Sequence, residues 1–145
     1  MNSEIKLLTE EDIHLMEDVL EDDDMVFELN KLKKYLSFPQ NKGFIVKVDG
    51  KIVGFAYCYD LMHPDNKVAL FLYSIGMLPD YQNKGLGTKL LEYIKQYAVD
   101  NHYFEMFVIT DRGNPRACHV YEKLGGINDY EDEVVYVYNF EKERK

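Results

Sequence analysis

The sequence contains no tryptophan, only two cysteines and only four prolines among its 145 residues. Cys58 and Cys118 lie far apart and form no Cys-x-x-Cys pair, so neither a disulfide framework nor a zinc site is expected. The four histidines are scattered without the spacing of metal ligands, and we expect no metal. Internal repeats and Pro/Gly-rich linkers are also missing, which at this length predicts a single domain over residues 1–145.

Long apolar runs are missing as well. The longest near-continuous stretch, Val68–Tyr73, is far shorter than the ~20 residues that cross a bilayer. Near the start, Glu4 stands where a signal peptide would carry positive charge, and no apolar segment follows it. With no sign of disulfides, these features predict a cytoplasmic protein.

Basic residues are scarce: 17 stand against 26 acidic ones, giving a net charge of -9. Such a chain is a poor partner for nucleic acid or for an anionic membrane. The acidic surplus could serve recognition of a cation or solubility alone, and composition leaves both open. A hydrophobic content of 46% excludes intrinsic disorder.

Hydrophobic periodicity predicts an α/β fold with a mixed sheet flanked by helices, in the order βααβββαβα followed by one or two strands. The predicted elements are a strand over Ile5–Leu8, helices over Ile13–Leu20 and Val26–Leu36, strands over Phe44–Val48, Lys51–Tyr57 and Val68–Met77, a helix ending at Asn101, a strand over Tyr103–Thr110, a helix from Asn114 or Pro115 to Leu124, and a closing strand over Val134–Phe140.

Local signals mark several boundaries. Thr9–Asp12 has the residue types of a capping box, and the four acids of Glu21–Asp24 interrupt the first helix. Asp49-Gly50 is a strong hairpin signal, and Gly76 within a strand indicates a bulge or a close backbone approach. Gly125-Gly126 ends the last helix.

The segment Leu78–Thr88 joins a strand to a helix through Gly85 and Gly87. Glycines let several backbone amides point one way at the positive end of a helix, which is a ready anion site, although an ordinary tight turn has the same composition. A P-loop is excluded because no Gly-Lys-Ser/Thr follows the second glycine. A dinucleotide fingerprint fails because Leu90 stands where a third glycine is needed.

A second segment reads Asn-Pro-Arg-Ala-Cys-His-Val-Tyr-Glu-Lys-Leu-Gly over residues 114–125. Together with Gln82-x-x-Gly85-x-Gly87, it resembles the GNAT superfamily of acetyl-CoA-dependent N-acetyltransferases. Their loop reads Gln/Arg-x-x-Gly-x-Gly/Ala, and their later helix reads Asn-x-x-Ala-x-x-x-Tyr-Glu-Lys-Leu-Gly. The resemblance covers essentially the whole chain, is strongest from Val68 to Gly126, and implies a GNAT-type acyl-CoA N-acyltransferase fold.

The resemblance also implies which residues meet the cofactor. Acetyl-CoA would bind through its pyrophosphate to the loop amides, through its pantetheine arm to backbone at the strand end, and through one side chain before the last helix. These residues are Gln82, Asn83, Lys84, Gly85, Leu86, Gly87 and Thr88 for the pyrophosphate, Met77 and Leu78 for pantetheine, and Asn114.

In the reaction that the resemblance implies, a primary amine attacks the thioester, and the leaving thiolate benefits from a proton donor. The family's tyrosine matches Tyr121, which without the motif would be a core aromatic residue. An aspartate matching Asp111 lies near the amine in the aminoglycoside 3-N-acetyltransferase branch, which this chain resembles; otherwise Asp111 is a loop or N-cap carboxylate. Ser74 stands where that branch usually has an acid, so the general base is unassigned.

The function expected from these features is acetylation of a small cationic amine, aminoglycoside-like as the first candidate. A polyamine, a peptide N-terminus and a lysine side chain are alternative acceptors, and a CoA-binding module without catalysis is a further alternative. Exposed sheet edges and the predicted closing strand make a homodimer possible.

Overall fold

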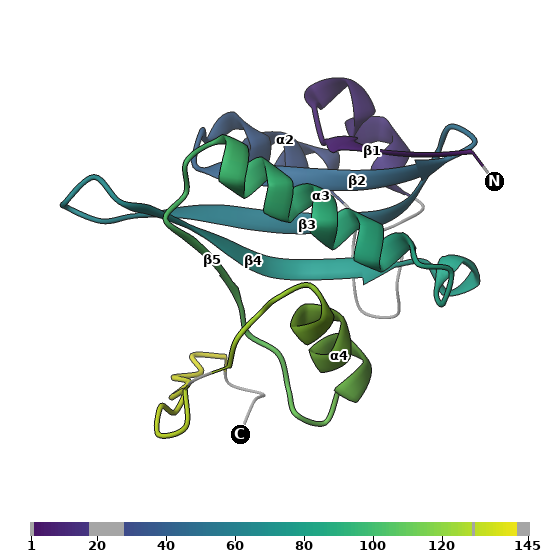
Figure 1. Ribbon diagram of the computed structural model, residues 1–145. Helices are drawn as coiled ribbons and strands as arrows, with labels where there is room; N and C mark the ends of the chain where they lie inside the picture. Colours follow the sequence, from purple (N-terminus) through teal and green to yellow (C-terminus); the bar gives the residue numbers. More distant parts are fainter. Residues whose placement is uncertain (1, 18–27, 129, 142–145) are drawn as a thin grey trace. The chain divides into compact units, whose positions relative to one another are not determined.

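A five-stranded sheet forms the core of the computed structural model, which describes residues 2–17, 28–128 and 130–141 (Figure 1). Its strands are β1 (Ser3–Leu7), β2 (Asn41–Val48), β3 (Lys51–Met62), β4 (Val68–Met77) and β5 (Glu105–Val108). They lie in the order β1-β2-β3-β4-β5, with every pair antiparallel except β4 and β5. The chain divides into two units, residues 1–111 and 112–145, and the sheet belongs to the first.

The hairpin between β2 and β3 forms where the sequence predicts it. Asp49 has φ of 51° and Gly50 has φ of 82°, and both values are needed in a two-residue turn that matches the twist of the strands. The predicted strand Val68–Met77 has the bounds of β4, because its apolar run is bracketed by polar turn residues.

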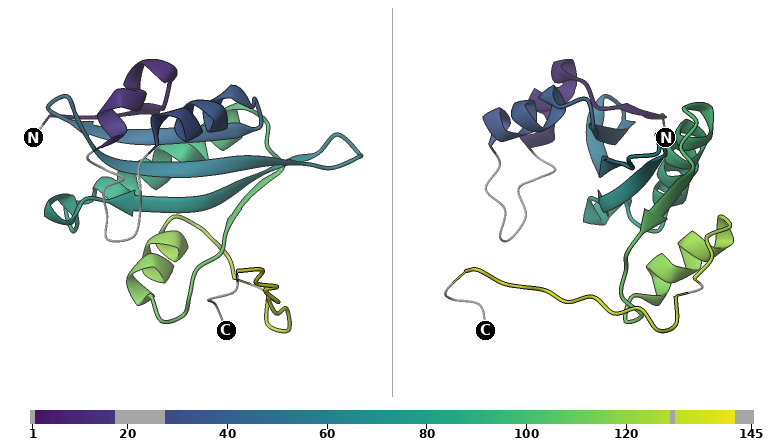
Figure 2. Two further views of the ribbon diagram at one scale, coloured as in Figure 1. Left: turned by 180° about the vertical axis from the view of Figure 1, so that it is seen from behind. Right: turned by 90° about the vertical axis from the view of Figure 1, so that its left-hand side faces the viewer.

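Helices cover both faces of the sheet in the first unit (Figures 1 and 2). The helix α3 (Leu86–Asp100) lies on one face and buries Leu86, Leu90, Leu91, Ile94 and Ala98, much as its 3.6-residue period predicts. The 3-10 helix η1 (Glu10–Met16) and α2 (Leu29–Ser37) lie on the other face, over a core of Leu8, Ile13, Met16, Leu32, Ile45 and Ile52.

The predicted capping box at the start of η1 is wrong. Thr9 makes no side-chain capping bond, and the Asp12 carboxylate turns toward the sheet. There it lies 2.9 Å from the Lys6 ammonium of β1 and 2.8 Å from the Lys47 ammonium of β2. Two charged donors stabilise this buried carboxylate more than a hydrogen bond from one backbone amide would. The helix begins at Glu10, as the predicted N-cap position at Thr9 requires, and residues 18–27, including the acidic segment Glu21–Asp24, lie outside the described residues.

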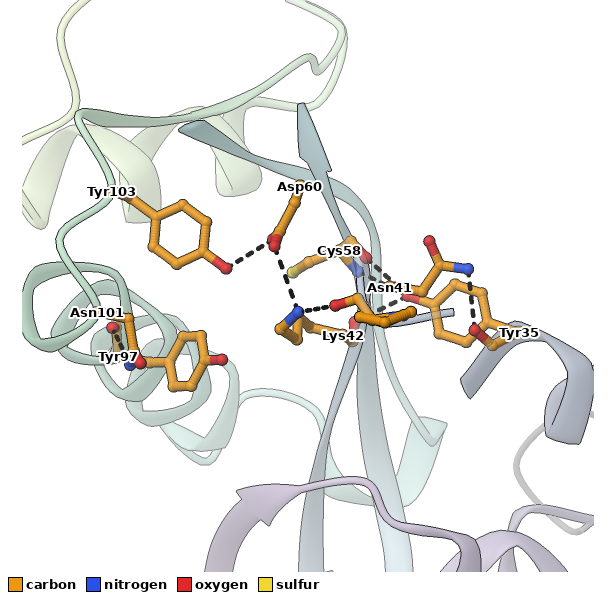
Figure 3. A network of polar contacts seen from close by, with 9 residues as sticks. Tyr35, Asn41, Lys42, Cys58, Asp60, Tyr97, Asn101 and Tyr103 are labelled. Atoms are coloured by element: carbon orange, nitrogen blue, oxygen red, sulfur yellow. Dashed lines mark hydrogen bonds and ion pairs between the residues drawn. The ribbon is translucent and has the colours of Figure 1, made fainter. Parts of the chain in front are cut away.

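Polar contacts fix both helical layers to one end of the sheet (Figure 3). On the α2 side, the Tyr35 hydroxyl lies 2.8 Å from the carbonyl oxygens of Lys42 and Cys58. On the α3 side, the Tyr103 hydroxyl donates to Asp60 at 2.6 Å, and Asp60 also pairs with the Lys42 ammonium at 3.3 Å. Beside these contacts lies a pocket of about 700 Å³, which Lys42 and Tyr97 help to line.

The second unit contains α4 (Pro115–Lys123). The Asn114 side-chain oxygen caps it by accepting the Ala117 N–H at 3.1 Å. At the other end Gly125 has φ of 94°, and the N–H of Gly126 donates to the Tyr121 carbonyl at 2.9 Å. Both ends of the helix are therefore closed by local bonds, and the predicted glycine stop is confirmed.

The predicted closing strand Val134–Phe140 is wrong for the single chain. The segment is irregular (Figure 2), and no described strand pairs with it. Alternating apolar residues favour extended backbone, but a strand also needs a partner for its hydrogen bonds. The strand predicted over Tyr103–Thr110 is also shorter, since only Glu105–Val108 pairs with β4.

Every helix in the described part of the chain is too short or too polar to span a membrane.

Candidate functional site

The two parallel strands, β4 and β5, pair only along the first half of β4. β5 pairs only with Ala69–Leu72, whereas β4 continues to Met77. Along the same stretch Tyr73 is skipped in the pairing with β3, because Cys58 pairs with Leu72 and Tyr57 with Ser74. The early end of β5 leaves the β4 backbone without a described strand partner on that side from residue 73 to residue 77, while its other side stays paired with β3 beyond the bulge. The arrangement provides an open backbone edge that an extended ligand could follow.

The close contact at Gly76 is with a side chain, and the bulge of β4 lies at Tyr73 instead. The Phe55 ring packs so closely on Gly76 that an added Cβ would lie 2.9 Å from its carbon atoms. Gly76 itself pairs regularly with Phe55 across β3 and β4. The glycine is therefore needed for packing of the aromatic ring, and Tyr73, 64% exposed, accounts for the irregular pairing.

Met77 and Leu78 lie at the end of this open edge, and part of their backbone is already used. The Met77 carbonyl accepts the Gln82 side-chain amide at 3.1 Å, and the Leu78 N–H donates to Val53 at 2.8 Å. The backbone N–H of Gln82 is used as well, since it donates to Pro79 at 3.3 Å within η2 (Pro79–Tyr81). These contacts fold the loop back onto the strand end and fix its path toward α3.

The loop then enters α3 through two positions with positive φ, Asn83 at 61° and Gly85 at 79°. The first backbone bond into the helix runs from the Lys89 N–H to the Gly85 carbonyl at 3.1 Å. The N–H groups of Leu86, Gly87 and Thr88 come before this bond, and, as at any helix start, they have no acceptor in the preceding turn. With the positive end of a 15-residue helix behind them, these amides favour an anion.

The two glycines of the loop have different reasons to be there. Gly85 is explained by its left-handed backbone, which L side chains adopt at a cost. Gly87 has no positive φ, and a Cβ on it would meet nothing within 4 Å. A helix with glycine at an interior position is less stable than one with alanine, and neither the backbone conformation nor the packing at Gly87 explains why glycine stands there. Space held open above an amide suits a phosphate group that approaches the backbone closely.

The other predicted residues lie around α4. Tyr121 is half-buried on this helix, and burial, followed by the nearby Cys118 thiol, raises the pKa of its hydroxyl above 10.0. Tyr121 is therefore protonated at neutral pH, as a proton donor must be. Asn114 uses its oxygen as a helix cap, which leaves its NH₂ hydrogens as the donors for a ligand. Asp111 is exposed in the irregular segment between β5 and α4.

The sequence-based reasoning missed a series of aromatic rings on the sheet face opposite α3. Tyr59 lies edge-on to Tyr35 at 5.5 Å between ring centroids and to Tyr73 at 5.7 Å, and Phe71 continues the series to Phe107 at 4.7 Å. The alternation of aromatics in β3 and β4 was the available signal, because every second residue of a strand shares a face.

Two further observations concern where a ligand could bind. Among the described residues, no group of three or more His, Cys, Asp or Glu side chains is arranged to hold a metal ion. The 700 Å³ pocket lies between β1, β2, α2 and Tyr97 and is lined by none of the predicted site residues. The feature with cofactor-binding chemistry is therefore the open β4 edge that leads to the start of α3.

Comparison with known proteins finds a matching family model and several similar proteins. The model of the acetyltransferase (GNAT) family matches residues 7–126. Spermidine N(1)-acetyltransferase from Escherichia coli K12 is 27% identical over 93 residues, which are 63% of this chain and 48% of that protein. Streptothricin acetyltransferase A from Bacillus subtilis 168 is 36% identical over 62 residues, 43% of this chain and 36% of that protein. The chain thus spans about half, or less, of the curated relatives that it matches.

A solved structure extends the likeness to nearly the whole chain. An aminoglycoside acetyltransferase from an uncultured soil metagenomic sample, in complex with trehalose, has a TM-score of 0.79 and 25% identity. The alignment covers 97% of both chains.

Proposed function

The chain belongs to the acetyltransferase (GNAT) family, and on this premise we propose that it transfers the acetyl group of acetyl-CoA to a primary amine of a small polycationic molecule. The observation that carries the proposal is the open β4 edge leading to the uncovered amides of α3. An aminoglycoside is the first candidate acceptor, as in the 3-N-acetyltransferase branch.

Acetyl-CoA, the acetyl donor of this family, fits the residues present. Its pyrophosphate would lie on the amides from Asn83 to Thr88, above the free space at Gly87. Its pantetheine amides would bond the β4 backbone near Met77 and Leu78, on the side that β5 leaves open. The Asn114 NH₂ group would donate to the cofactor. Because the Gln82 N–H already bonds Pro79, this residue supports the loop through its side chain instead of binding phosphate.

The chemistry requires two protons to be moved. An alkylammonium with a pKa of about 10.4 is neutral in only about one molecule in a few thousand at pH 7, a cost of about 4.6 kcal/mol. A carboxylate near the amine lowers that cost by accepting the proton, and Asp111 is our candidate. At the other end, the Tyr121 hydroxyl would protonate the leaving CoA thiolate, since it holds its proton at neutral pH.

The choice of a polycation rests on charge and on the relatives. The acids Asp111, Glu131, Asp132 and Glu133 are exposed, and the chain carries a net charge of -9. Spermidine, streptothricin and aminoglycosides, which the names of the similar proteins specify, all carry several amines. Polyamines are therefore the second candidate acceptors. Ser74, half-buried on β4, supplies no negative charge, so a 3-N-specific aminoglycoside site would depend on the other acids.

A panel assay tests the proposal. Purified protein is incubated with acetyl-CoA and with aminoglycosides, polyamines, a peptide N-terminus or a lysine peptide, and free thiol is followed. We expect turnover with polycationic amines and kcat/KM values lower by orders of magnitude with peptides. The reverse order would make the protein a peptide acetyltransferase. CoA binding without thiol release from any amine would identify a binding module without catalysis.

Tyr121→Phe separates catalysis from binding. The variant is expected to lose most of kcat while its CoA dissociation constant stays unchanged, because only the hydroxyl proton is removed. Tyr130→Phe, at an exposed tyrosine of the same unit, is the matched control and should keep full activity. An unchanged kcat in Tyr121→Phe would assign protonation of the thiolate to water or to another group.

A further inference from the structure

One corner of the first unit is left open because β1 is shorter than its neighbour β2. Leu7, the last residue of β1, pairs with Phe44, so residues 41–43 at the start of β2 extend past the end of β1. The Leu8 N–H still donates to the Gly43 carbonyl at 2.7 Å, and the chain then leaves the sheet for η1. The pocket of about 700 Å³ lies at this corner, which is the size of pockets that hold small molecules.

Part of the pocket lining is apolar. Leu7 and Leu8 line it from β1 and the residue after it, Leu36 lines it from α2, and Tyr97 lines it from α3. The Tyr97 ring is held in place edge-on to the Phe44 ring, with 5.2 Å between the ring centroids. Such a surface favours a ligand with a hydrocarbon or aromatic body.

The charged part of the lining is mainly basic, in a chain whose net charge is -9. Lys33, Lys34 and Lys42 line the pocket against one acid, Glu10. The Lys33 ammonium lies 3.9 Å from the Glu10 carboxylate, and both side chains are more than half exposed, so this ion pair is weak. The macrodipole of α2 favours a lysine in its last turn, which accounts for Lys34 but not for three lysines around one pocket.

The third lysine, Lys42, is fixed before any ligand arrives. Its ammonium pairs with the Asp60 carboxylate at 3.3 Å and donates to the Pro39 carbonyl (Figure 3). Asp60 also accepts the Tyr103 hydroxyl at 2.6 Å, so its negative charge is shared between two donors. The Lys42 side chain is only 21% exposed. A cation held in this way loses little conformational entropy when an anion binds beside it.

We propose that this pocket binds a small organic anion with an aromatic or aliphatic body and a terminal carboxylate or phosphate. The body would contact the leucines and Tyr97, and the anionic group would pair with the ammonium groups of Lys33 and Lys34. A polycationic amine, the acceptor proposed above, is disfavoured here because the lining carries the same sign of charge. None of the residues assigned to acetyl-CoA lines the pocket, and all of its lining residues belong to the first unit.

Four probes with one aromatic body separate charge from shape. They are 2-naphthoate, 2-naphthyl phosphate, the neutral 2-naphthalenemethanol and the cation 2-naphthylmethylamine. Each is titrated into the full chain by isothermal calorimetry in the presence of saturating CoA, so that the amides at the start of α3 are occupied. We expect both anions to bind at least about 10-fold more tightly than the neutral probe, and the cation to bind most weakly. The tighter of the two anions identifies which anionic group the pocket prefers.

Variants of the lining test the charge and the space in turn. The double variant Lys33→Gln/Lys34→Gln should raise the dissociation constants of both anions by about 10-fold and leave that of the neutral probe unchanged. Lys31→Gln/Lys51→Gln is the matched control, since it removes the same charge at two exposed positions outside the pocket. Asn30→Trp, at an exposed position of the lining, should fill the pocket and weaken anionic and neutral probes alike. Circular dichroism should show the same secondary structure in all variants.

Amide chemical shifts locate the bound probe. The N–H signals of Leu8 and Gly43 should move when 2-naphthoate is added, and those of Leu86 and Gly87 should not. Movement at Leu86 and Gly87 instead would place the anion at the start of α3 and overturn the proposal. Equal affinity for all four probes, no binding of either anion at millimolar concentration, or the same loss in both double variants would overturn it too. A chain that fails to bind CoA would refute the proposed acetyl transfer, and the shift map would still decide where the anion binds.

Discussion

Replacing Gly87 by alanine is expected to stabilise the free protein and, at the same time, to weaken its affinity for CoA. Gly87 lies in the first turn of α3 with no positive φ, and a Cβ there would meet nothing within 4 Å. Alanine at such a position removes freedom from the unfolded chain and stabilises by about 0.4–1 kcal/mol. For a chain of this size, the Tm should rise by about 1–4 °C in a calorimetric or circular dichroism melt.

The effect on binding has the opposite sign. The methyl group would occupy the space into which we place the pyrophosphate, and one amide–phosphate hydrogen bond would be lost. Hydrogen bonds to a charged group contribute about 1.5–3 kcal/mol each, so the CoA dissociation constant should rise by about 10-fold to 100-fold. Isothermal titration calorimetry with CoA, in the absence of any amine, measures this change directly.

Two further variants make the test sharp. Gly85→Ala should also weaken CoA binding, but it should lower the Tm, because alanine at φ of 79° costs about 1–2 kcal/mol. Glu92→Ala, an exposed change on the same helix, should leave CoA affinity unchanged. If Gly87→Ala bound CoA as tightly as the wild type, the reason given for the glycine and the placement of the pyrophosphate would both be wrong.

Three other predictions concern the cap, the buried carboxylate and the thiols. Asn114→Ala should lower the free energy of unfolding by about 1 kcal/mol in urea melts, whereas Asn114→Asp should keep the cap but weaken CoA binding, because it loses the NH₂ donors. Burial raises the pKa of Asp12, but hydrogen bonds from its two lysine partners outweigh burial and hold it below 3.8. The ion pairs of Asp12 therefore stabilise the fold above pH 3.8, and this stabilisation is lost as the pH falls through the lower pKa that Asp12 has in the folded protein. Asp12→Asn should lose less stability over that pH range in urea melts. Burial raises the pKa of the Cys58 thiol to about 12, so a thiol reagent should modify Cys118 in the native protein and Cys58 only after unfolding, which mass spectrometry resolves.

The sequence by itself determined the elements whose signals are local. Asp49-Gly50 predicts its hairpin because few residues tolerate two successive positive φ angles. The spacing of apolar residues in α3 and the glycines after α4 likewise act within one or two turns of a helix. The two motifs that carry the family resemblance are local too, and the family match over residues 7–126 confirms that assignment.

The tertiary structure decided what depends on partners distant in the sequence. Asp12 has the spacing of a capping residue, yet two lysines on neighbouring strands attract its carboxylate into the core. The early end of β5 leaves the β4 edge open, and Tyr73 forms a bulge against β3; both follow from strand pairing that no short pattern encodes. Val134–Phe140 has the alternation of a strand but forms none in the single chain, because a strand exists only where another backbone supplies its hydrogen bonds.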